Sequence, residues 1–98
     1  MTKPIATIGT DNDFVELFMD RVNDLVRLYA RGTQHIGSVP DYSSIGKVMV
    51  CEEDAVNAAV DLEYAAFDFL DARGGRGYKD NGLGFGEAVE KALDEVNA

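Results

Sequence analysis

Residues 52–73 carry the pattern that most restricts the possible folds of this 98-residue chain, because their apolar side chains recur at helical spacing. Acidic residues stand at the start of the segment and Arg73 stands at its end, as the helix dipole favours. The segment therefore predicts an amphipathic helix, and the rest of the fold has to bury its apolar face. The residues on that face are Val56, Ala59, Val60, Phe67 and Leu70.

The opposite face of this predicted helix is acidic. Residues 52–72 contain seven Asp and Glu and no Lys or Arg, so they hold −7 of the net charge of −9. Asp54, Asp61 and Asp68 recur every two turns, about 10 Å apart along the axis, and Glu53 and Asp71 widen the stripe. Like charges gain nothing from i,i+4 pairing. Two interpretations follow: a solvated helix face, or a docking face for a basic surface.

Residues 10–31 are also predicted to form a helix. Thr10 or Asp11 is a favoured capping residue at its start, and Gly32 is a favoured stop. The apolar residues of the segment recur at helical spacing. They are Phe14, Phe18, Val22, Leu25, Val26 and Tyr29.

The remaining segments predict a third helix and a small sheet. Residues 86–97 are expected to form a short helix and residues 4–9 and 46–51 short strands. Residues 33–45 are expected to be a loop, with room for a short extended piece. Residues 74–86, with six glycines in thirteen positions, are expected to be a flexible connection or a hairpin that turns at Asn81 and Gly82. We therefore predict one compact α+β domain over residues 1–98. This domain is expected to contain three helices packed with a two- to three-stranded antiparallel sheet.

Two charged residues fall on the apolar sides of the predicted helices: Arg21 in residues 10–31 and Glu63 in residues 52–73. A lone buried charge is costly, whereas a paired one is tolerated. We expect Arg21 and Glu63 to form a structural pair where the two helices meet, or both to reach solvent along their aliphatic stems. A functional pair is the alternative.

The sequence carries no recognisable catalytic, metal or cofactor motif. His35 is the only histidine and Cys51 the only cysteine, which is too few for an ordinary zinc site and supports no catalytic triad. Cys51 is expected to be a small core residue. The glycines at 82, 84 and 86 are not followed by the lysine of a phosphate-binding loop. We expect no enzymatic activity, no metal and no cofactor.

The charge limits the partners. A net charge of −9 and a pI near 4.3 repel nucleic acid and anionic membranes and favour a basic protein surface. The alternative interpretation is that the acidic residues only keep the protein soluble. A single cysteine fits a reducing compartment, and no apolar run has the length of a signal peptide or a membrane span. We expect a cytoplasmic protein; the sequence leaves its oligomeric state open, with a slight preference for a monomer.

In size, acidity, lack of enzymatic motifs and the acidic segment 52–72, the chain resembles the small phage-encoded anti-CRISPR proteins. The resemblance implies an inhibitor in a bacterial host that binds a CRISPR effector complex, with a multi-subunit type I effector favoured. Its acidic surface would mimic nucleic acid and cover the effector's DNA-binding lysines. The alternatives are an immunity protein or antitoxin that neutralises a basic toxin, or a structural or regulatory subunit with incidental acidity.

Overall fold

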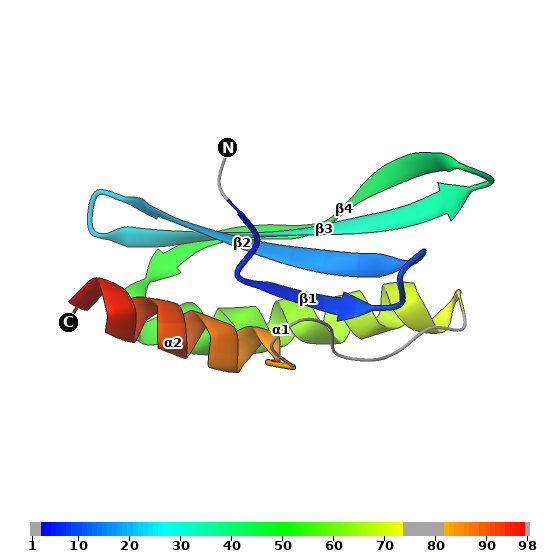
Figure 1. Ribbon diagram of the computed structural model, residues 1–98. Coiled ribbons are helices and arrows are strands. Elements are labelled where there is room, and N and C mark those ends of the chain that lie inside the picture. The colour runs from blue at the N-terminus through cyan, green and yellow to red at the C-terminus, as the bar shows by residue number, and fades with distance from the viewer. Residues whose placement is uncertain (1–2, 74–81, 98) are drawn as a thin grey trace.

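An antiparallel sheet is followed by two helices in the computed structural model, which describes residues 3–73 and 82–97 (Figure 1). The four strands lie in the order of the chain, and each pairs with the next. The α+β class is confirmed, but the structure has four strands and two helices in place of the expected two or three strands and three helices. The elements are β1 (Ala6–Gly9), β2 (Phe14–Val22), β3 (Leu25–Ile36), β4 (Val39–Cys51), α1 (Glu52–Asp71) and α2 (Phe85–Asn97).

The predicted helix over residues 10–31 is wrong, because this segment contains β2, the first part of β3 and the turn between them. Val15 and Leu17 are buried on one side of β2, while the aromatic Phe18 lies half-buried on the other side. Apolar residues on both faces of a strand leave no clean alternation, and their spacing also fits a helix. Asn23, with φ of 57°, forms the turn, and asparagine is one of the few residues that adopts this conformation readily.

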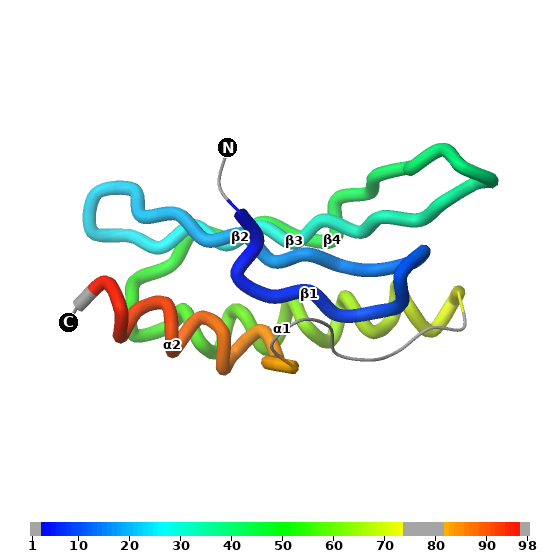
Figure 2. The backbone as a smooth tube through the Cα atoms, viewed as in Figure 1, coloured from blue at the N-terminus to red at the C-terminus, as the bar shows by residue number. Residues whose placement is uncertain are grey.

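The predicted loop over residues 33–45 is also wrong, because it forms the outer half of a long hairpin. Ile36 of β3 is opposite Val39 of β4, and Gly37, with φ of 66°, lies in the two-residue turn. This hairpin projects past the other strands (Figure 2). The strand predicted at residues 46–51 is the last part of β4, and the strand predicted at residues 4–9 is β1.

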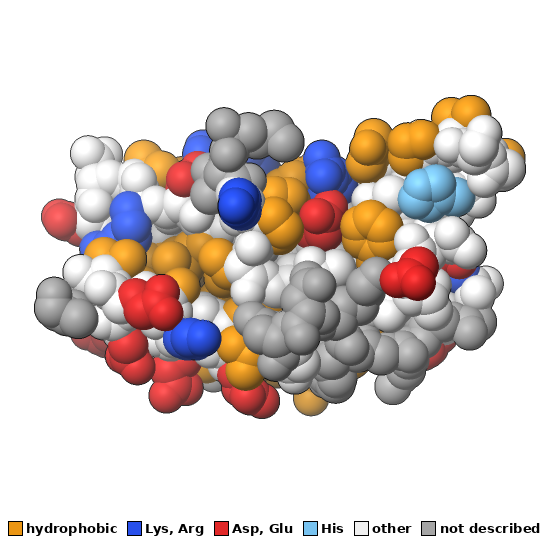
Figure 3. Space-filling model, in the orientation of Figure 1, with side chains coloured by type: hydrophobic (Ala, Val, Ile, Leu, Met, Phe, Trp, Pro, Cys, Tyr) orange, Lys and Arg blue, Asp and Glu red, His pale blue; other side chains and the backbone are white. Residues whose placement is uncertain are grey.

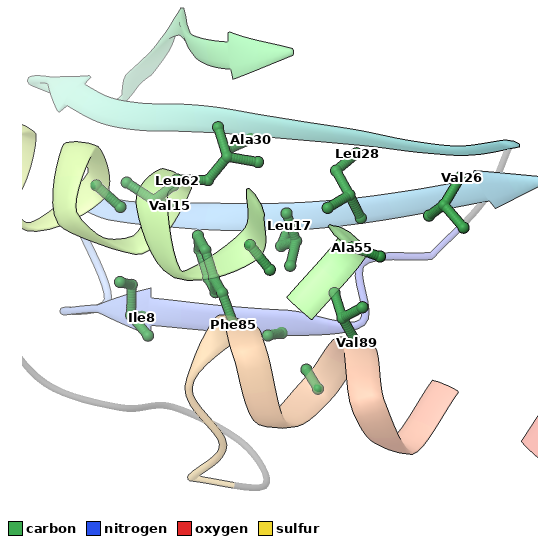
Figure 4. Close-up of a cluster of buried hydrophobic side chains, with 14 of the residues drawn as sticks. Ile8, Val15, Leu17, Val26, Leu28, Ala30, Ala55, Leu62, Phe85 and Val89 are labelled. Atoms are coloured by element: carbon green, nitrogen blue, oxygen red, sulfur yellow. The ribbon is translucent and has the colours of Figure 1, made fainter. Parts of the chain in front are cut away.

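Both helices lie against the same face of the sheet (Figure 1). The helix predicted at residues 52–73 is α1, and the one predicted at residues 86–97 is α2. Three of the five buried residues of α1 are alanines, which allow the helix axis to come close to the strands. Figure 4 shows side chains from the strands and from both helices meeting in one cluster. No helix in the described part of the chain is long and apolar enough to cross a membrane.

Most of the glycine-rich connection over residues 74–86 lies outside the described residues. Where the description resumes, Phe85 begins α2 and its side chain is completely buried. The structure therefore places the end of the connection in the core. Asn81, the first turn residue of the predicted hairpin, lies outside the described residues.

Candidate functional site

The five acidic residues expected to bind a partner all lie exposed on α1. We call Glu53, Asp54, Asp61, Asp68 and Asp71 the acidic face. The opposite side of the same helix carries the buried residues Ala55, Ala59, Leu62, Ala66 and Leu70. Burial of that side fixes the rotation of α1 about its axis, so the acidic face points away from the sheet.

The acidic face is little involved in internal ion pairs. Within residues 3–73 and 82–97, Glu53, Asp54, Asp61 and Asp68 take part in no salt bridge. Asp54 Oδ2 accepts a hydrogen bond at 3.2 Å from Cys51 Sγ. A thiol is only a weak hydrogen-bond donor. These four carboxylates can therefore meet a basic partner without first breaking a salt bridge to the described residues.

Tyr64 adds an aromatic ring to this surface. It lies three residues after Asp61 and four before Asp68, so it stands in the same row of the helix. Its exposed fraction of 67% is high for a large aromatic side chain. Tyrosine is enriched at the centres of protein interfaces. Tyr64 was not among the residues predicted to bind a partner, although its helical spacing to the two aspartates is a signal in the sequence.

The charge of the protein is divided between its two layers. Residues 3–51, which form the sheet, contain six Asp or Glu and five Lys or Arg. The two helices contain eleven acidic residues and one lysine, Lys91. Acidic side chains gather along the helical side in Figure 3. Because α2 packs beside α1, its exposed Glu87, Glu90, Asp94 and Glu95 extend the negative surface beyond the predicted residues.

The expected pair of Arg21 and Glu63 is not formed. Arg21 lies near the end of β2, and its Nη1 is 3.1 Å from Glu52 Oε2 at the start of α1. Glu63 Oε1 accepts a hydrogen bond from the backbone N–H of Phe85 at 2.6 Å. The prediction assumed two packed helices, whereas Arg21 belongs to a strand. Glu63 instead binds the first N–H of α2, where a negative charge also suits the helix dipole.

Other residues considered for chemistry are not brought together. His35 Nδ1 lies 2.8 Å from the carbonyl oxygen of Asn12. Cys51 is exposed, which corrects the expectation of a core residue, because it ends the edge strand β4. No group of three His, Cys, Asp or Glu residues in the described ranges is arranged to hold a metal ion.

The comparisons with known proteins gave no match: no protein-family model, no curated protein and no solved structure is similar to this chain.

Proposed function

We propose that this protein is a non-enzymatic binding protein whose acidic face docks onto a cationic surface of a partner. The observation that carries the proposal is the exposure of Asp54, Asp61 and Asp68 on one rigid helix, outside the salt bridges of the described residues. A helix presents these carboxylates in a fixed row, so little conformational freedom is lost on binding. Tyr64 within the row supplies an anchor that can be buried.

The more specific form of the proposal is an anti-CRISPR inhibitor. A row of carboxylates resembles a nucleic-acid strand in that both present regularly spaced negative charge to lysines and arginines. The acidic face would occupy the DNA-binding groove of a CRISPR effector complex, with a type I effector favoured, and exclude the target DNA. The same geometry also suits an immunity protein or antitoxin for a basic toxin, because both partners present a cationic surface.

A competition assay tests this function. The protein is titrated into a purified type I effector complex with its labelled target DNA, and bound DNA is followed by gel shift. We expect release of DNA near equimolar ratio, with a weaker effect as salt rises from 50 to 200 mM. Retention of the DNA at a tenfold excess of protein over effector contradicts the anti-CRISPR function.

A matched pair of variants tests the acidic face itself. The triple variant D54N/D61N/D68N removes three charges from α1, whereas E90Q/D94N/E95Q removes three exposed charges from α2. We expect the first variant to lose inhibition at least tenfold and the second to keep it within about threefold. Equal losses in both variants would show that net charge, and not the acidic face, produces the effect.

A further inference from the structure

The face of the sheet that the helices leave uncovered combines aromatic and charged side chains. Residues that are opposite each other in paired strands share a face of the sheet. One row across β2, β3 and β4 is Phe18, Tyr29 and Lys47, and the next row is Asp20, Arg27 and Met49. Arg31 lies on the same face, beside the rings of Phe18 and Tyr42. We call these residues, with the Arg31 partner Glu16, the open sheet face: Glu16, Phe18, Asp20, Arg27, Tyr29, Arg31, Tyr42, Lys47 and Met49.

The open sheet face is internally ordered. The guanidinium carbon of Arg31 lies 5.3 Å from the centre of the Phe18 ring and 4.6 Å from that of Tyr42. Arg31 Nη2 also donates to Glu16 Oε1 at 2.9 Å. A side chain held by two rings and a carboxylate has already lost its rotamer freedom. Burial of Arg31 against another surface therefore costs less side-chain entropy than burial of a mobile arginine.

The face is also shaped to receive side chains. A shallow concavity of about 450 Å³ opens on it, lined by Phe18, Tyr29, Lys47 and their neighbours. Met49 is 48% exposed and Tyr42 is 56% exposed, so apolar surface flanks the charged groups. Aromatic residues, methionine and arginine are the types enriched at protein interfaces. This composition favours a protein as the occupant.

The charged residues of the open sheet face favour a second copy of the chain over a nucleic-acid strand. The face carries both signs, with Arg27 and Arg31 bonded to Asp20 and Glu16, and Lys47 exposed and free of salt bridges to the described residues. A nucleic-acid strand would meet the two carboxylates as well as the cations. A second copy presents the same mixture, and a two-fold axis can bring each Lys47 near a carboxylate of its partner.

We propose that the open sheet face is a self-association surface through which two copies pack sheet to sheet about a two-fold axis. The molecule measures 42 by 22 by 22 Å, so its whole sheet side, with the open sheet face at the centre, has the dimensions for the about 800 Å² per partner that stable interfaces bury. The proposal is independent of the partner of the acidic face.

The uneven distribution of charge makes such a dimer compatible with a net charge of −9. Packed sheets lie about 10 Å apart, and each acidic helical layer lies behind its own sheet. The two negative layers are therefore separated by more than the Debye length of about 8 Å at physiological salt. The dimer presents its two acidic faces on opposite outer sides, so each protomer keeps its acidic face accessible.

Sedimentation equilibrium of the full chain from 5 to 500 μM tests the proposal. We expect a concentration-dependent rise from the monomer mass of 10.7 kDa toward twice that value. The variant K47E is compared with K91E, which makes the same change in charge on exposed α2. K47E and M49E are expected to raise the dimer dissociation constant at least tenfold, and K91E to change it less than threefold, with folding checked by circular dichroism.

Three results would overturn the proposal. The first is a monomer throughout the concentration range. The second is a dimer that K47E and M49E leave intact, because it would use another surface. The third is a wild-type chain that stays monomeric but binds a twelve-nucleotide oligo-dT through Lys47, which would assign the face to single-stranded nucleic acid.

Discussion

The hydrogen bond from the Phe85 N–H to Glu63 Oε1 predicts that Glu63 stabilises the docking of α2 on α1. The two residues are 22 positions apart, and their 2.6 Å contact is part-buried. Replacing Glu63 with alanine removes the acceptor and the negative charge at the helix start. Loss of an N-terminal cap costs about 0.5–2 kcal/mol, and loss of a hydrogen bond to a charged group about 1.5–3 kcal/mol.

The greater helix propensity of alanine offsets a few tenths of a kcal/mol of this loss. We therefore expect Glu63→Ala to lower the free energy of unfolding by about 1–2 kcal/mol. In a domain of this size, that is a decrease in Tm of about 5–15 °C. Glu63→Gln keeps an oxygen acceptor without the charge, so about half of the loss is expected.

Thermal and urea unfolding followed by far-ultraviolet circular dichroism measure these differences. Asp61→Ala is the matched control, because Asp61 lies on the same helix, is exposed and forms no salt bridge with the described residues. Its substitution is expected to change stability by about 0.5 kcal/mol or less. If Glu63→Ala is no more destabilising than Asp61→Ala, Glu63 does not hold α2 in place.

Substitutions at three further positions test the packing and one turn in the same unfolding assays. Phe85→Ala is expected to cost about 3–5 kcal/mol because the side chain is fully buried between the layers, and a cost below 1 kcal/mol would contradict this position. Gly32→Ala is expected to cost about 1–3 kcal/mol, since a Cβ would lie 2.7 Å from the Phe69 ring; a neutral effect would show that the ring moves freely. Asn23→Ala is expected to cost about 1–2 kcal/mol because φ is 57° there, whereas Asn23→Gly should be close to neutral; equal effects would argue against this turn.

The sequence alone determined the two helices and the acidic face. In α1, apolar and acidic residues occupy opposite sides and the first turn is acidic, so one local pattern fixes both the helix and the direction of Asp54, Asp61 and Asp68. The local pattern of β2 and β3 was ambiguous: Val26, Leu28 and Ala30 alternate with more polar residues as in a strand, but Phe14, Phe18 and Val22 also recur at helical spacing. These strands carry apolar or aromatic residues on both faces, and their spacing fits a helix as well as a strand.

Only the tertiary structure decided which distant residues meet. It replaced the expected pair of Arg21 and Glu63 with two other contacts, to Glu52 and to the Phe85 N–H. It also placed the acidic helices on one side of a nearly neutral sheet. The physical reason is that helix periodicity is a property of neighbouring residues, whereas strand pairing and helix docking depend on contacts between residues far apart in the chain.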